Sequence, residues 1–226
     1  MNLKGKTVLV TAGAIREYID DVRVITNISS GALGAKIADA FYKEGCKVHY
    51  VHAKHSIKPT ELEGSEISRM NYWPVVTAND LMENMKVVCT SMKPDIVIHS
   101  AAVSDFTFEK KGSVKLSSNS EKDFIDYLSK TIKINPKIIS MIKDWCSDTK
   151  LVGFKFTVGK ELKELKEIAL NMMNKVNCDL VIANDKEEMV KQGSHIAYLI
   201  KEYMCMKVNG KDNIASYLIK VFKNEF

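Results

Sequence analysis

The chain has 226 residues, of which 46% are hydrophobic and 27% charged, with a formal net charge of +5. This composition supports a full apolar core, and we expect a single domain over residues 1–226. The modest positive charge suits anionic small molecules as well as nucleic acid. No interleaving of aromatic and basic residues typical of RNA-binding proteins occurs, so no nucleic-acid partner is expected. No apolar run approaches the ~18 residues of a transmembrane helix, and no signal-peptide core precedes the first strand-like segment, so we expect a cytoplasmic protein without a membrane partner.

Strand-like and helix-like patterns alternate along the chain. In chain order, they predict a strand at 6–11, a helix at about 31–45, a strand at 47–52, a helix at about 79–92, strands at 95–100 and 151–154, a helix near 160–176, a strand at 180–183, two tightly joined strands at 195–201 and 203–208, and a helix at 212–223. Such alternation is typical of a parallel sheet with right-handed crossovers. The expected fold is therefore α/β, a Rossmann-like three-layer arrangement with a mostly parallel central sheet and a C-terminal strand pair.

The cysteines and histidines give no metal-binding pattern. The five cysteines are scattered without a C-x-x-C motif, which favours reduced, mostly buried thiols over a disulfide framework or a zinc site. His49, His52 and His55 are spaced three apart, but a strand would turn His49 and His52 to opposite faces. His99 and His195 lie in apolar strand-like runs and are expected to be hydrogen-bonded core histidines.

The segment 20–34 joins the first strand to the first helix. A polar loop with glycine and serine before a helix offers unpaired N–H groups to a phosphate. This loop is too long, and its glycines are wrongly spaced, for the G-x-G-x-x-G fingerprint of dinucleotide-binding proteins. The Y-x-x-x-K pairs Tyr50/Lys54 and Tyr203/Lys207 lie in strand-like segments and not on a helix. An NAD(P)H-dependent reductase of the short-chain type is therefore only the alternative interpretation, in which Lys54 would contact a 2′-phosphate.

The stretch 107–122, called the flap segment below, is polar and rich in lysine, serine and glutamate. It follows a strand that ends near 101–105, at the edge where ligands bind in open α/β sheets. One interpretation of this position is a flexible basic flap that covers a bound anion. The alternative is an ordinary solvated surface loop, and the pattern supports both interpretations equally.

Several motifs, in a fixed order and spacing, carry a resemblance to a known family. They are Thr11-Ala12-Gly13 with Arg16-Glu17, Ile19-Asp20 and Val22-Arg23, then Thr26–Gly31 with Gly34, Ala101–Asp105, Asn135–Ile139, Val152–Lys155 and Asp179–Asp185. Over nearly its whole length the chain resembles the phosphopantothenate–cysteine ligases (phosphopantothenoylcysteine synthetases), in the stand-alone bacterial form without a preceding flavin-dependent decarboxylase.

The resemblance implies a two-step ligation in coenzyme A biosynthesis. CTP activates the carboxylate of 4′-phosphopantothenate as an acyl-nucleotidylate and releases pyrophosphate. The amine of L-cysteine then attacks the acyl carbon to give 4′-phosphopantothenoylcysteine. The family also implies Mg²⁺ on the triphosphate and a homodimer. Base choice depends on backbone geometry, so the motifs leave CTP and ATP open.

On the side of the acid, the resemblance assigns catalysis to Asn27 and Lys115. The Asn27 amide would donate to the acyl region without carrying charge, and Lys115 in the flap segment would neutralise phosphate charge in the transition state. Arg23, Ser30 and Gly31 would bind the substrate, the last two through N–H groups that face its phosphate. The alternatives are a turn-forming Asn27 and a surface ion pair for Arg23.

On the side of the nucleotide, the resemblance implies a longer set. The implied nucleotide-binding residues are Ala102, Val103, Asp105, Lys115, Pro136, Ile138, Ile139, Phe154, Lys155 and Lys175. Asp105 would also hold Mg²⁺, and Phe154 would pack on the base unless it is a core residue. Lys137 stands where many relatives carry an aspartate, which puts a ribose or metal role at that position in question.

Overall fold

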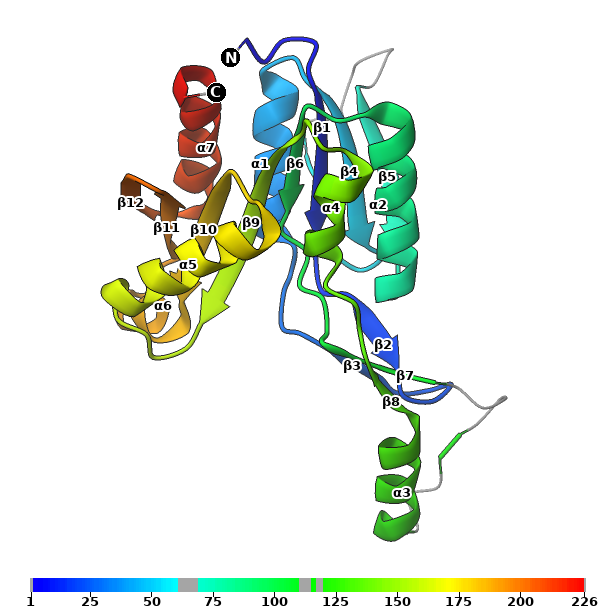
Figure 1. Cartoon of the computed structure of the whole chain (residues 1–226). Coiled ribbons are helices and arrows are strands. Elements are labelled where there is room, and N and C mark those ends of the chain that lie inside the picture. Colours follow the sequence, from blue (N-terminus) through cyan, green and yellow to red (C-terminus); the bar gives the residue numbers. More distant parts are fainter. Residues whose placement is uncertain (1, 61–68, 110–114, 117–119, 226) are drawn as a thin grey trace.

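The computed structural model describes residues 2–60, 69–109, 115–116 and 120–225, and its centre is an eight-stranded sheet in the order β12-β11-β10-β9-β6-β1-β4-β5 (Figure 1). The strands of this sheet are β1 (Thr7–Ala12), β4 (Lys47–Ala53), β5 (Met70–Val75), β6 (Ile96–His99), β9 (Lys150–Thr157), β10 (Leu180–Asp185), β11 (Ile196–Lys201) and β12 (Met204–Asn209). The strands from β10 to β5 are all parallel, and β11 and β12 add an antiparallel pair. The predicted mostly parallel sheet with a C-terminal strand pair is confirmed.

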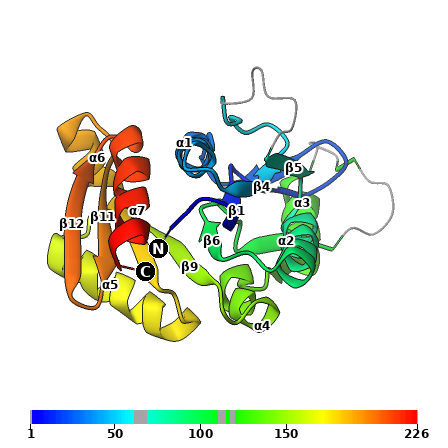
Figure 2. The ribbon, with the colours of Figure 1, turned by 90° about the horizontal axis from the view of Figure 1, so that it is seen from above.

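Helices cover both faces of this sheet (Figure 2). The helices are α1 (Ala32–Lys43), α2 (Ala78–Met92), α4 (Ile142–Trp145) after the 3₁₀ turn η1 (Ile138–Met141), α5 (Leu162–Val176), α6 (Lys186–Gln192) and α7 (Lys211–Glu225). α1 and α7 pack on one face, while α2, α4 and α5 pack on the other. Side chains alternate along β1, so Val8 and Val10 enter the first layer and Leu9 enters the second. The predicted three-layer, Rossmann-like fold is thereby confirmed.

Four short strands and one helix project beyond the carboxyl ends of the parallel strands and form what we call the arm (Figure 1). They are β2 (Arg16–Tyr18), β3 (Val24–Thr26), β7 (Phe106–Phe108), β8 (Ile132–Ile134) and α3 (Glu121–Thr131). β2 pairs with β3 and β7 with β8, both antiparallel. The buried Glu17 carboxylate ties the arm to the domain, because it accepts from the Ala78 amide at 2.7 Å and from the Thr107 hydroxyl at 2.6 Å.

The arm stands where the sequence predicts loops. Segment 20–34 contains β3, and the flap segment begins in β7 and ends in α3, so the prediction of an irregular stretch is wrong at these places. Strands of three residues are too short to give a readable alternation. Residues 110–114 and 117–119 of the flap segment lie outside the described residues, and its flexibility stays a prediction.

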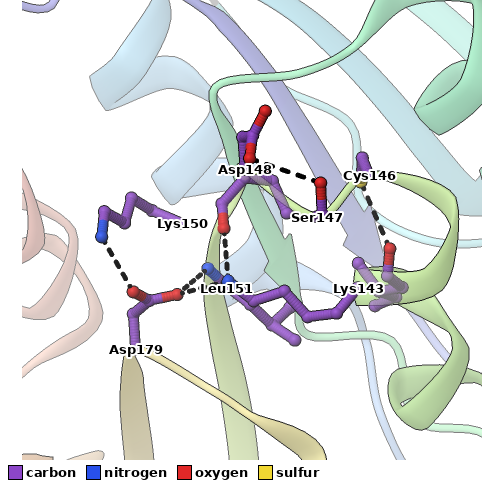
Figure 3. Close-up of polar contacts among 9 residues, drawn as sticks. Lys143, Cys146, Ser147, Asp148, Lys150, Leu151 and Asp179 are labelled. Atoms are coloured by element: carbon purple, nitrogen blue, oxygen red, sulfur yellow. Dashed lines mark hydrogen bonds and ion pairs between the residues drawn. The ribbon is translucent and has the colours of Figure 1, made fainter.

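An ion-pair cluster closes the opposite, amino end of the sheet (Figure 3). Asp179, just before β10, accepts from Lys143 at 3.0 Å, from Lys150 at 3.1 Å and from the Leu151 amide at 2.9 Å. Burial raises the pKa of Asp179, but the hydrogen bonds from the amide and the two lysines lower it by a larger amount. The pKa of this carboxyl therefore lies below its usual range. This cluster joins α4, β9 and β10 far from the strand ends that carry the candidate site. Within the described residues, no helix has the length and apolarity needed to cross a membrane.

Candidate functional site at the carboxyl ends of the strands

The loops that follow β1, β4 and β6 meet at one edge of the sheet. The Ala102 amide donates to the Gly13 carbonyl at 2.9 Å, and the Ile57 amide donates to the Ser30 carbonyl at 2.9 Å. Gly13 has φ +89°, and a Cβ there would lie 2.5 Å from the Ser56 Cβ. Only glycine combines this backbone conformation with so close an approach. The loops are therefore held against one another by main-chain contacts.

The N-terminus of α1 lies at this edge. Gly31 caps the helix in a left-handed conformation, with φ +77°. The Ser29 hydroxyl accepts from the Gly31 amide at 3.4 Å, and the exposed Ser30 hydroxyl accepts from the Ala32 amide at 3.3 Å. These are long hydrogen bonds, which an anion could replace. Gly34 serves packing, since a Cβ there would lie 2.6 Å from the Ala12 Cβ.

Asn27 bridges two of these loops. Its side-chain amide is exposed and donates to the Val103 carbonyl at 3.0 Å. The preceding Thr26 hydroxyl donates to the Ile15 carbonyl at 2.9 Å, which fixes the end of β3 against the residue that directly precedes β2. The amide of Asn27 is thus placed beside the segment that follows β6.

Asp20 and Arg23 connect the β2–β3 turn to the flap segment. The Asp20 carboxylate is inaccessible and accepts from Arg23 Nη1 at 2.6 Å and from the Leu116 amide at 3.1 Å. Arg23 also donates to the Leu116 carbonyl at 3.2 Å. Arg23 therefore forms an ion pair, as its alternative interpretation expects, but with a buried partner and not at the surface. Its guanidinium lies next to the segment that carries the exposed Lys115.

Asp105 forms an ion pair with Lys137 beyond the end of β6, and both side chains are mostly exposed. The Asn135 amide donates to the Asp105 carbonyl at 2.9 Å, and the Asn135 side chain donates to the Ser104 carbonyl at 3.0 Å. The two segments that the motifs assign to the nucleotide are therefore in direct contact. Lys137 thus partners the predicted metal ligand.

The other predicted nucleotide residues divide into two groups. Ala102 and Val103 are half-buried at the strand edge, Pro136 is exposed, and Phe154 and Lys155 are half-buried near the end of β9. Ile138 and Ile139 pack into the core beside α2 and α5, and Phe154 packs partly against the core beneath α1 and α7, as its alternative interpretation expects.

Lys175 is not brought to this edge. It lies in the last turn of α5, the helix that joins the parallel strands β9 and β10. Such a crossover helix runs back toward the start of the next strand, so its last turn lies at the amino ends of the strands. The structure therefore gives Lys175 no place beside Asp105 and Phe154.

A pocket of about 430 Å³ opens beside Asn27, and Asp105 is not among its lining residues. Its lining residues are Ala14, Arg16, Thr26, Asn27, Ile28, Ser29, Ser30, Ala53, Lys54, His55, Ser56, Val75 and Val76. Arg16 belongs to one of the sequence motifs, but the motif assigns it no role. Its position directly after the first strand was the signal that could have identified it.

The histidines form no metal centre in the part of the chain that the structure describes. His99 Nδ1 lies 3.0 Å from the Thr11 hydroxyl, and burial lowers the pKa of His99 to about 4. His195 differs from the expected hydrogen-bonded core histidine, because its Nε2 is buried without a hydrogen-bond partner among the described residues. Neither Tyr50 nor Tyr203 of the Y-x-x-x-K pairs lies on a helix.

The fold defines an α/β protein of the Rossmann-like class, and its strand ends carry the candidate ligand-binding site. The family described as the DNA/pantothenate metabolism flavoprotein C-terminal domain matches residues 3–225, and the chain belongs to it. The family resemblance predicted from the motifs is confirmed.

Curated relatives and solved structures agree with this assignment. The chain is 34% identical to the coenzyme A biosynthesis bifunctional protein CoaBC of Methanocaldococcus jannaschii over 98% of its own length and 52% of that protein. It is 34% identical to CoaBC of Thermococcus kodakarensis over 89% of its length and 47% of that protein. The chain thus spans about half the length of these relatives. The solved DNA/pantothenate metabolism flavoprotein from Streptococcus pneumoniae superposes with a TM-score of 0.80 at 30% identity, covering 98% of this chain and 100% of that one.

Proposed function

We propose that the chain ligates 4′-phosphopantothenate to L-cysteine, using CTP to form an acyl-nucleotidylate, in coenzyme A biosynthesis. The observation that carries the proposal is the hydrogen bond from the Asn27 amide to the Val103 carbonyl, which sets a neutral donor between α1 and the Asp105 segment. The family membership and the solved complex of Cab2 with phosphopantothenate-cysteine support the choice of substrates. That complex is 17% identical to this chain, so it supports the shared fold and suggests the chemistry.

In this proposal the acid lies with its carboxylate next to Asn27. The amide turns from the Val103 carbonyl to the acyl oxygen, whose charge changes during activation and attack by the amine. A neutral donor serves both charge states of that oxygen. Lys115 approaches the phosphates from the flap segment and compensates the charge that collects as pyrophosphate leaves.

The nucleotide is proposed to lie along the ends of β6 and β9, near Val103, Asp105, Phe154 and Lys155. Asp105 suits Mg²⁺, because that ion is usually held by one or two carboxylates together with substrate phosphates, and this carboxylate is exposed. Bound there, Mg²⁺ would offset triphosphate charge. Lys137 would then exchange its partner, leaving the carboxylate for a phosphate oxygen.

A homodimer is proposed through the arm. Large apolar side chains of the arm and its adjoining loops are exposed, namely Val22, Val24, Ile25, Ile28, Phe106, Ile125, Ile132 and Ile134. An exposed apolar surface of this kind is typical of a protein–protein contact. A second copy of the chain would cover it and would bring a second arm close to the site.

The proposal is tested with purified protein, 4′-phosphopantothenate, L-cysteine, Mg²⁺ and CTP or ATP in parallel reactions. The expected result is 4′-phosphopantothenoylcysteine together with one pyrophosphate and one CMP per product, with less or no product from ATP. Absence of the amide product with every nucleotide would overturn the proposed function. Product from ATP alone would overturn only the choice of nucleotide.

A further inference from the structure

Two cysteines meet in the layer between the sheet and the helices α2, α4 and α5. Cys89 lies in the last turn of α2 and is fully buried, and Cys146 directly follows α4 and is half-buried. Both pack in the same apolar cluster, where α2 contacts α4. Their side chains are hydrogen-bonded to each other, and neither forms a disulfide in this structure. We call these two residues the thiol pair.

The main chain of α4 holds Cys146 in place. Its amide and its thiol both donate to the Ile142 carbonyl, at 2.9 Å and 3.4 Å (Figure 3). Lys143 belongs to the same helical turn, and its ammonium is fixed by the Asp179 carboxylate at 3.0 Å. The Cys146 sulfur therefore has two fixed neighbours, the Cys89 thiol and a positive charge.

These neighbours give the two thiols different roles. The Cys89 thiol donates to the Cys146 sulfur, and this hydrogen bond holds the pKa of Cys146 below its usual range, although burial opposes it and Lys143 assists. The same hydrogen bond, together with burial, raises the pKa of Cys89. Cys146 is therefore the thiol of the pair that ionises first, and the thiolate is the nucleophilic form of cysteine.

The other three cysteines all lie among the described residues, and their surroundings differ. Burial raises the pKa of Cys46 and of Cys178 to about 12, and it also raises the pKa of the exposed Cys205. The Cys46 thiol donates to the Leu3 carbonyl at 3.1 Å. These three residues are therefore natural controls for the thiol pair.

Access to the pair determines which reagent it suits. Cys89 is fully buried, whereas Cys146 is half-buried and is followed by the exposed Ser147 and Asp148, so a small molecule meets Cys146 first. Two neighbouring thiols give up two electrons when they join, and a small disulfide accepts two electrons as its halves leave. Cystine is one such disulfide, and it is the oxidised form of the amino acid in the proposed reaction.

We propose that the thiol pair is a reversible modification site for low-molecular-weight disulfides, with Cys146 as the attacking thiol and Cys89 as the resolving thiol. The Cys146 thiolate attacks one sulfur of the small disulfide, forms a mixed disulfide and releases the first small thiolate. Cys89 then gives up its proton, and its sulfur attacks the Cys146 sulfur and releases the second small thiolate. The two cysteine thiols are thereby oxidised to one disulfide, and the small disulfide is reduced to two thiols, which take up both protons. The inference does not rest on the proposed function, because no step involves the candidate site.

The test uses Cys205→Ser as the parent protein, because this change removes the exposed thiol outside the pair. The reduced, folded parent is incubated with cystine or, in parallel, with oxidised glutathione. Free thiols are then alkylated, and the digest is mapped by mass spectrometry. The expected result with at least one probe is a cross-linked peptide that joins Cys89 to Cys146, and dithiothreitol should reverse it. A parent that keeps both thiols free with both probes, or that forms its disulfide through Cys46 or Cys178, would overturn the proposal.

Three variants of this parent test the two roles. With Cys89→Ala the reaction should stop at a mixed disulfide on Cys146, because the resolving thiol is missing. With Cys146→Ala the remaining thiol at Cys89 should react at least about tenfold more slowly. The matched control Cys178→Ala removes another buried thiol from the same layer and should form the cross-link as the parent does.

The outcomes of the variants decide the assignment of the two roles. A mixed disulfide on Cys89 in Cys146→Ala at the parent's rate, or none on Cys146 in Cys89→Ala, would overturn it. Circular dichroism checks that each variant is folded. The peptide map of the parent requires neither Cys89→Ala nor Cys146→Ala, so it tests the proposal even where a variant does not fold.

Discussion

Replacing Asp20 with asparagine tests how the β2–β3 turn holds the flap segment. The Asp20 carboxylate accepts from the amides of Val22 at 2.8 Å, Arg23 at 2.6 Å and Leu116 at 3.1 Å, as well as from Arg23 Nη1 at 2.6 Å. An asparagine offers one acceptor oxygen and turns an N–H donor toward these donors. We expect the turn to open and Leu116 to lose its anchor.

The magnitude follows from the pKa of Asp20. Burial raises this pKa, but hydrogen bonds from the three amides and the guanidinium together lower it by a larger amount. The net effect takes the pKa from the ordinary 3.8 to about 2. At 1.36 kcal/mol per pKa unit, the difference corresponds to about 2 kcal/mol in favour of the charged form. Because the folded-state pKa is depressed, this stabilisation is fully present above about pH 4 and is lost as the pH falls through about 2.

The assay is urea unfolding of wild type and Asp20→Asn, with hydrogen exchange of the Val22, Arg23 and Leu116 amides. At pH 7 the variant is expected to lose about 2 kcal/mol and to exchange these amides faster, and the gap to wild type narrows as the pH falls toward 2. Asp144→Asn, an exposed carboxylate on α4, is the matched control and should change neither quantity. Equal stability and exchange at pH 7, or a stability difference that does not depend on pH, would show that the Asp20 carboxylate does not hold this turn.

Three further predictions address the site and the opposite end of the sheet. Asn27→Asp should lower kcat in the pyrophosphate assay by about 10²–10³-fold with folding intact. The control Asn213→Asp loses a similar amide-to-carbonyl hydrogen bond on α7 and should keep wild-type turnover. Lys137→Ala should lower the Mg²⁺ concentration for half-maximal activity by about two- to fivefold, because Asp105 loses its exposed ion-pair partner, and an unchanged Mg²⁺ titration would contradict that pairing. Asp179→Asn should lower the free energy of unfolding in urea by about 2–3 kcal/mol, since two lysines lose a mostly buried partner, and a loss below about 0.5 kcal/mol would show that the cluster contributes little.

The sheet was predictable from the sequence because its strands are long and apolar. Runs such as Thr7–Ala12 and Leu180–Asp185 are buried almost throughout, and the periodic helices between them require parallel crossovers. β5 was missed because only Met70 and Val75 of its residues are buried, so it lacks the apolar run of a central strand. The arm was missed because its strands have three residues each and depend on partners distant in sequence.

The candidate site was predictable where a sequence motif fixes the backbone. It was not predictable where residues distant in sequence form an ion pair. Gly13, Gly31 and Asn27 stand in ordered motifs, and the structure brings them to one edge. The Lys137–Asp105 ion pair joins residues 32 apart in the chain, which no local pattern reveals. The prediction that Lys175 binds the nucleotide was wrong for a related reason. Its helix is correctly predicted, but a crossover helix runs back toward the start of the next strand, so its last turn lies away from the site.

The most direct test of the central claim is to omit cysteine and quench the reaction of enzyme, 4′-phosphopantothenate, Mg²⁺ and CTP for mass spectrometry. We expect 4′-phosphopantothenoyl-CMP and pyrophosphate in equal amounts, up to one per active site. When cysteine is added, the intermediate should convert to 4′-phosphopantothenoylcysteine and CMP. Release of CDP and orthophosphate, or no nucleotide consumption before or after cysteine is added, would contradict it.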